Sequence, residues 1–133
     1  MKSQMVSEHP RASAVRSVLR KLMGSGEAGV KAAAAISSDG LVIASVLQEG
    51  VDADRFAAMS ASLLALADRA IVETKRGSLK QLLIEGTNGA VLLVQAGDDA
   101  VLAVSTDPGA LIGKIFLDAR NSAGDLRNCL QGY

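Results

Sequence analysis

Residues 81–106 read QLLIEGTNGAVLLVQAGDDAVLAVST, and this stretch decides the fold. Three runs rich in apolar and β-branched residues, 81–85, 90–95 and 100–105, are separated by the short polar segments GTNG and GDD. Glycine, asparagine and aspartate are the residues that tight turns prefer, and short turns join antiparallel strands. The stretch therefore predicts a three-stranded antiparallel meander.

A second hairpin is predicted upstream of the meander. Residues 31–37 and 41–47 are two short apolar runs that flank Ser38, Asp39 and Gly40. Glycine accepts a positive φ at a turn, and aspartate can hydrogen-bond to the nearby backbone. These two runs bring the expected number of strands to five.

Three segments have apolar residues at helical spacing. The first covers 11–23 and ends at a glycine-rich turn, and the second runs from a cap at Asp52 or Asp54 to about residue 76. The third is expected to open at Thr106 or Asp107, with Pro108 in its first turn, and to run to about residue 130. The order α-β-β-α-β-β-β-α predicts an α/β (α+β) domain, with a five-stranded antiparallel sheet flanked by helices. Residues 1–9 are expected to be a flexible N-terminal segment, and residues 10–133 to form one domain.

The second helix is apolar around almost its whole circumference. At about 100° per residue, one stripe is expected to face the sheet; it consists of Phe56, Met59, Leu63, Leu66, Ala67 and Ala70. Further apolar residues extend well beyond that stripe, namely Ala57, Ala58, Ala61, Leu64, Ala65, Ile71 and Val72. A domain of this size cannot bury a helix on every side, so we expect a partner to cover the rest.

Composition narrows the range of partners. The 133 residues carry 14 basic and 14 acidic side chains, so the formal net charge is zero, which favours neither nucleic acid nor an anionic membrane. The aromatic residues are Phe56, Phe116 and Tyr133, too few for stacking on bases. The start of the sequence lacks the apolar run that a signal peptide would need, so a signal peptide is not expected. No apolar run approaches about 18 residues, so membrane insertion is not expected either. The single cysteine, Cys129, favours a reducing compartment, and the expected location is the cytoplasm.

The residues needed for catalysis are scarce. The only histidine, His9, falls in the N-terminal segment, and Cys129 has no histidine near it in sequence. The carboxylate pairs at 52/54 and 98–99 are explained as a helix cap and a turn. No glycine-rich segment has the spacing of a P-loop. We therefore predict no catalytic, cofactor-binding or metal-binding residues, and no enzymatic activity.

A small basic cluster, Lys75 and Arg76 with Lys80, follows the second helix. Basic side chains at this position complement the helix dipole and remain solvated. A role in docking an acidic partner stays open beside this structural explanation.

Three segments together resemble one known family. They are AISSDGLVIAS at 35–45, LLIEGTNGAVLLV at 82–94, and AVLAVST at 100–106 running into GALIGKI at 109–115. In this order, with helices between them, they resemble the Roadblock/dynein light chain family and especially its bacterial MglB-like branch. The resemblance covers about residues 11–130.

The resemblance implies a profilin-like architecture, with the second helix on one face of the sheet and the terminal helices on the other. It also implies a homodimer in which third strands pair edge to edge and second helices pack together. The interface residues expected on this basis are Ala57, Ala61, Leu64, Ile71, Gln81, Leu83 and Glu85. On the same reasoning, Leu64→Glu should weaken dimerisation and leave the sheet core intact.

The resemblance further implies a partner. MglB-like proteins bind a Ras-like small GTPase and modulate its nucleotide cycle, which requires only that they stabilise one conformation of its switch loops. The expected docking residues lie on the outward side of the second helix: Ala58, Ser62, Ala65, Arg69 and Arg76. Two alternatives remain, a scaffold subunit of a larger motor or trafficking complex that has no effect on GTP turnover, and a domain that senses a small molecule.

Overall fold

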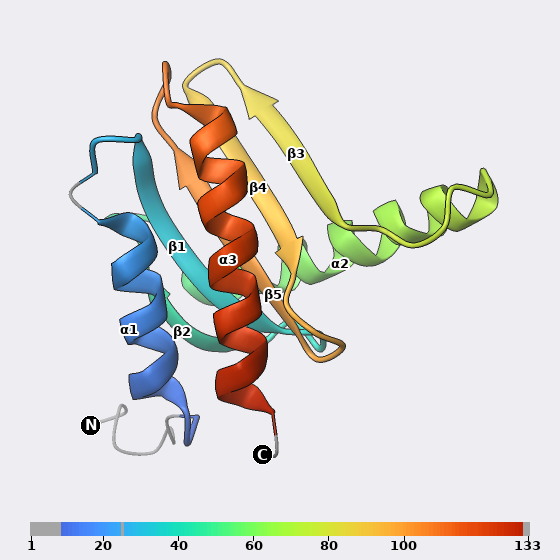
Figure 1. The fold of residues 1–133 in the computed structure, drawn as a ribbon, viewed down its shortest axis with the longest axis horizontal. Helices are drawn as coiled ribbons and strands as arrows, with labels where there is room; N and C mark the ends of the chain where they lie inside the picture. Colours follow the sequence, from blue (N-terminus) through green and yellow to red (C-terminus); the bar gives the residue numbers. More distant parts are fainter. Residues whose placement is uncertain (1–8, 25, 132–133) are drawn as a thin grey trace.

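The computed structural model describes residues 9–24 and 26–131, so all of the predicted flexible segment 1–9 except His9 lies outside the described residues. The chain folds into one five-stranded sheet with helices on both faces (Figure 1). The elements in chain order are α1 (Ala12–Met23), β1 (Val30–Ser37), β2 (Val42–Val46), α2 (Ala53–Glu73), β3 (Gln81–Gly86), β4 (Gly89–Gln95), β5 (Ala100–Thr106) and α3 (Ile112–Leu130).

The sheet has the strand order β2-β1-β5-β4-β3, and every neighbouring pair is antiparallel. The predicted meander is confirmed, with Leu83 opposite Leu92 and Leu92 opposite Val104. The upstream hairpin is also confirmed, and β1 of that hairpin pairs with β5 to complete the sheet. Strand β5 is the central strand and β1 is its neighbour, and both are buried over most of their length, which explains their nearly continuous apolar sequence.

The helices form two layers on opposite faces of the sheet. Helices α1 and α3 lie side by side over one face, and α2 crosses the other face (Figure 1). The larger core cluster lies under α1 and α3 and includes Leu19, Leu102 and Leu126. A smaller cluster between α2 and the sheet includes Ile36 and Leu93. The predicted fold class is confirmed, and so is the placement of the terminal helices on the face opposite α2.

The last helix begins later than predicted. Helix α3 starts at Ile112, whereas Thr106 is still in β5. The backbone N–H of Asp107 donates to the carbonyl oxygen of Gly29 at 2.8 Å, which ties this segment to the loop before β1. Gly109 has a φ of +79°, a left-handed conformation that a continuous α-helix excludes. Backbone hydrogen bonds to another loop therefore override the local capping signal.

Both ends of α2 have recognisable caps. The Oδ1 atom of Asp52 accepts the backbone N–H of Arg55 at 3.1 Å, so of the two proposed caps Asp52 is correct. At the other end, the N–H of Arg76 donates to the carbonyl of Ile71 at 2.9 Å, and Lys75 has a φ of +60°. This is a Schellman motif with lysine at the position that glycine usually occupies.

The rotation of α2 about its axis differs from the prediction. Met59, Leu63 and Leu66 were expected to face the sheet, but they are 53%, 41% and 63% exposed. The sheet is instead faced by Ala57 and Leu64, which are almost fully buried. The predicted stripe is wrong because a helix that is apolar nearly all round has no unique face to bury.

The turn between β1 and β2 helps to select the observed rotation. Gly40 has a φ of +88°, and a Cβ atom on it would lie 3.3 Å from the Cα of Ala58 and 3.6 Å from the Cβ of Ala61. The turn therefore approaches the helix backbone closely, and only a side of α2 made of small residues can accept it. The bulky residues of α2 are left on the other side.

Candidate protein-interaction site

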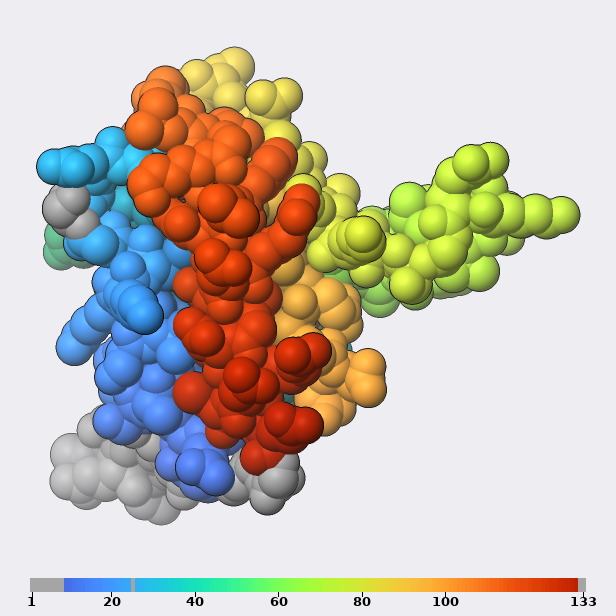
Figure 2. Space-filling model, viewed as in Figure 1, coloured from blue at the N-terminus to red at the C-terminus, as the bar shows by residue number. Residues whose placement is uncertain are grey.

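The C-terminal half of α2 extends past β3, the edge strand of the sheet. In Figures 1 and 2 this end projects to the right, clear of the body of the molecule. Residues 72–78 are all exposed, and Val72 is 57% exposed. The Oδ1 atom of Asp68 accepts the backbone N–H of Leu79 at 2.9 Å, which fastens the returning loop to the helix. A monomer thus presents several turns of a partly apolar helix to solvent.

The exposed side chains of α2 form an apolar flank. We define the apolar flank as the exposed residues Met59, Leu63, Leu66 and Ala70 with the half-buried Phe56 and Ala67. These residues share one side of the helix at about 100° per residue. A shallow hollow of about 420 Å³ lies over part of this flank and the neighbouring Ala58 and Ser62. Burying one large aliphatic side chain of this kind contributes about 1.5–3 kcal/mol, so the flank is a strong candidate for protein contact.

Strand β3 forms an open edge of the sheet. It pairs with β4 on one side, and no described strand pairs with its other side. Gln81 and Leu83 are half-buried and Glu85 is exposed. An open edge presents unpaired backbone N–H and C=O groups, which can pair with a strand of another chain.

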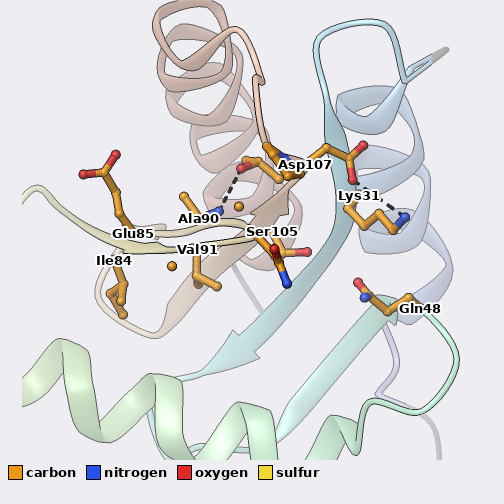
Figure 3. Close-up of a pocket in the computed structure, with 13 residues that line it drawn as sticks. Lys31, Gln48, Ile84, Glu85, Ala90, Val91, Ser105 and Asp107 are labelled. Carbon is orange, nitrogen blue, oxygen red and sulfur yellow. Dashed lines mark hydrogen bonds and ion pairs between the residues drawn. The ribbon is translucent and has the colours of Figure 1, made fainter.

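A hollow of about 560 Å³ lies on the α2 face of the sheet, at the end of the strands that α2 does not cover (Figure 3). We call it the sheet hollow; its residues include Ile84, Val91 and Ser105, and Lys31 and Asp107 form an ion pair at its rim with an N–O distance of 3.7 Å. Ile84 is 38% exposed although it is a large aliphatic residue on the sheet surface. The Ser105 hydroxyl is buried and has no hydrogen-bond partner among the residues that the structure describes. The hollow therefore has an uncovered apolar surface and an unsatisfied polar atom, both of which a protein partner could cover or satisfy.

The apolar flank and the sheet hollow lie on the same side of α2. Ala65 and Asp68, on the opposite flank, line a separate cleft of about 370 Å³ together with Ser38 and Asp98 of the two hairpin turns. Those turns are at the far end of the strands from the sheet hollow. The apolar flank consequently faces the hollow, with uncovered sheet next to it.

The predicted site residues have different outcomes. Ala57 and Leu64 are 0% and 5% exposed and belong to the core of the protomer, so they do not line an exposed seam, and Leu64→Glu would disrupt this core. Ala61 is half-buried beside Gly40 rather than on the apolar flank. Ile71 is half-buried near the projecting end of α2. The proposed docking residues Ala58, Ser62, Ala65, Arg69 and Arg76 are all exposed, and their role stays a prediction.

The proposed basic cluster does not form as a unit. Lys75 and Arg76 lie at the projecting end of α2, whereas Lys80 lies at the start of β3 after the loop has returned to the sheet (Figure 1). The guanidinium Nε of Arg76 donates to the carbonyl of Thr74 at 3.3 Å. Proximity in sequence was therefore misleading for these three residues.

Sequence reasoning missed the sheet hollow altogether. Its residues come from β1, from the ends of the meander and from the segment after β2, so no local sequence pattern links them. The residues of the apolar flank were visible as a helical stripe, but we assigned that stripe to the core. Their spacing identified them as a group, and only the packed structure shows that they are exposed.

The described residues offer little for chemistry. In the part of the chain that the structure describes, no three His, Cys, Asp or Glu side chains are grouped closely enough to hold a metal ion. The Nδ1 atom of His9 accepts the backbone N–H of Arg11 at 3.0 Å, and Cys129 is half-buried against the larger core cluster. Within residues 9–24 and 26–131, no helix is both long and apolar enough to cross a bilayer.

The structure is a small α+β domain with an open sheet edge at β3 and an exposed apolar flank on α2. The family model for the Roadblock/LC7 domain matches residues 19–106, which is more than half of the chain. A relative of Methanocaldococcus jannaschii, an uncharacterized protein, is 36% identical over 99 residues, covering 74% of this chain and 86% of its own. The chain therefore belongs to the Roadblock/LC7 domain family.

Solved structures share the fold of this chain. MglB of Myxococcus xanthus superposes with a TM-score of 0.83 at 18% identity and covers 91% of this chain and 98% of its own. A structure described as MglB with tetrameric arrangement gives a TM-score of 0.80 at 21% identity, covering 93% of each chain. These likenesses extend over nearly the whole length and show that the fold is that of MglB.

Proposed function

We propose that this chain is a homodimeric regulator that binds a Ras-like small GTPase and modulates its nucleotide cycle. The observation that carries the proposal is the exposed apolar flank of α2: Phe56 packs against the smaller core cluster, whereas Met59, Leu63, Leu66 and Ala70 belong to neither core cluster. Membership of the Roadblock/LC7 family and the likeness to MglB support the same proposal.

The proposed dimer is based on two features of the protomer, the projecting end of α2 and the sheet hollow. Each protomer has a helix end that extends past β3 and a sheet hollow that its own helix leaves uncovered. A two-fold axis beside β3 pairs the two edge strands antiparallel and brings each projecting helix end over the sheet of the other copy. The two apolar flanks then face each other, and Ile84 and Val91 of each copy become covered.

The GTPase-binding surface is proposed to be the outer side of the two α2 helices, away from the sheet. Ser62 and Arg69 lie on this side and are exposed in the protomer. A partner that prefers one conformation of its switch loops on this surface has its equilibrium shifted toward that conformation. This mode of action requires no catalytic residue from the chain itself.

Dimerisation is tested by Leu63→Glu, with Leu41→Glu as a matched control. Both leucines are exposed in the protomer, at 41% and 67%, but Leu41 follows the β1–β2 turn and lies outside the proposed interface. Light scattering after size exclusion should give a dimer for the unaltered chain and for Leu41→Glu, and a folded monomer for Leu63→Glu. A dimer that persists in Leu63→Glu would show that the apolar flank is not the seam.

GTPase binding is tested by retention of a Ras-like GTPase from the same organism on the immobilised dimer, loaded with GDP or with a non-hydrolysable GTP analogue. We expect preferential retention of one nucleotide state, and weaker retention by Arg69→Glu. Turnover and exchange assays on the same pair then separate the two functional classes. Binding that changes neither rate would favour the scaffold alternative, and equal binding of both nucleotide states would contradict the regulatory proposal.

A further inference from the structure

The helix layer over the α1/α3 face of the sheet stops before β3. Helix α1 packs over β1 and β2, and α3 packs over β4 and β5. Among the described elements, no helix covers β3 on this face, where Leu83 is only half-buried. The sheet thus has room for a third helix beside α3, at the separation of about 8–10 Å that packed helices adopt.

A groove of about 470 Å³ lies at this vacant position, between α3 and the start of β3. Its floor on the α3 side is formed by Ala123 and Gly124, and small residues of this kind let another backbone approach closely. The groove lies on the side of α3, away from its N-terminus. It therefore lacks the converging backbone N–H groups of a typical phosphate site.

The lining of the groove is basic. It contains Lys80, Arg120 and Arg127 and no carboxylate, in a chain whose acids and bases balance. All three side chains are exposed, and no described residue forms an ion pair with any of them. Arg127 also lines an adjoining hollow that contains Asp98 and Asp99.

Helix α3 sets the spacing of Arg120 and Arg127. They are separated by seven residues, which is two turns or about 10 Å along α3. The stem of Arg127 packs on the turn after β4, because a Cβ atom on Gly97 would lie 2.9 Å from the Cγ of Arg127. The guanidinium of Arg127 is thereby kept at one end of the groove.

From these features we propose that the groove binds an acidic amphipathic helix of a partner protein. Apolar side chains of that helix lie over Ala123 in the groove and continue along β3 toward Leu83, two residues beyond Gln81. Carboxylates seven residues apart pair with Arg120 and Arg127. A nucleic acid fits less well, because no aromatic residue lines the groove and the chain as a whole carries no net positive charge. The groove is on the face opposite α2, so this site is separate from the proposed GTPase surface.

The test uses a fluorescent helical peptide of about three heptads, with glutamates seven residues apart and leucines on the adjoining side. Fluorescence anisotropy should show saturable binding that weakens as salt is added. Arg120→Gln combined with Arg127→Gln should weaken binding roughly tenfold or more. The matched control is Arg20→Gln, an exposed arginine of α1 on the same face but outside the groove, and it should leave affinity within about twofold.

Three results would overturn the proposal. One is undiminished peptide binding by the double variant with native thermal unfolding. Another is equal binding of a peptide with lysines in place of the glutamates. The third is displacement of the peptide by inorganic phosphate or a single-stranded oligonucleotide at matched charge concentration, which would assign the groove to phosphate groups instead.

Discussion

Leu63 and Leu64 are adjacent in α2 and chemically identical, but their exposed fractions are 41% and 5%. Leu64 belongs to the core cluster between α2 and the sheet, so Leu64→Ala removes buried carbon atoms and leaves a cavity. We expect the free energy of unfolding to fall by about 3 kcal/mol, near the middle of the range for such changes. For a chain of this size, that corresponds to a decrease in Tm of about 10 °C. Leu63→Ala should lower the free energy of unfolding of the monomer by less than about 1 kcal/mol.

Urea unfolding, followed by circular dichroism at two protein concentrations, tests this contrast. At a concentration where the chain is monomeric, the difference between the two variants should appear in full. At a concentration where it is dimeric, Leu63→Ala should lose additional stability, because dimerisation stabilises the folded state by mass action. At the monomeric concentration, an equal loss in the free energy of unfolding for the two variants, or a larger loss for Leu63→Ala, would refute the observed rotation of α2.

Four further substitutions test local geometry. In thermal unfolding, Gly89→Ala should lower the free energy of unfolding by about 3 kcal/mol or more, because its Cβ would overlap the carbonyl oxygen of Thr106. Gly109 also has a positive φ, but the space around it is open, so Gly109→Ala should lower the free energy of unfolding by only about 1 kcal/mol. Asp52→Ala removes the cap of α2 and should lower the free energy of unfolding by about 1 kcal/mol, as followed by urea titration. Lys75→Gly relieves a left-handed lysine and should stabilise the last turn of α2 by up to about 1 kcal/mol, which slower amide hydrogen exchange there would reveal.

Much of the fold was predictable because its signals are local. The turn at Gly40 and the two turns of the meander are encoded in a few residues each, and the strands between them follow at once. The start of α3 was not predictable in this way. Residues 106–108 have a good capping sequence, but hydrogen bonds from 107 and 111 to the loop at 28–29 hold them outside the helix.

The candidate site was predictable only in part. The excess of apolar residues on α2 correctly indicated a helix with more apolar surface than one protomer covers. The particular residues were wrong where the argument depended on rotation, since Ala57 and Leu64 are in the core whereas Met59 and Leu66 are exposed. The sheet hollow and the basic groove beside α3 were invisible, because each combines residues from distant segments.

The sequence by itself determined the elements, their order and the antiparallel pairing within each hairpin, because residue preferences and short turns act over a few positions. Only the tertiary structure decided which side of α2 is buried. The close approach of Gly40 admits only small side chains, so the alanine side of the helix packs inward and Leu63 and Leu66 remain outside. That choice depends on packing between segments far apart in the chain, and it is what leaves an apolar surface free to bind a partner.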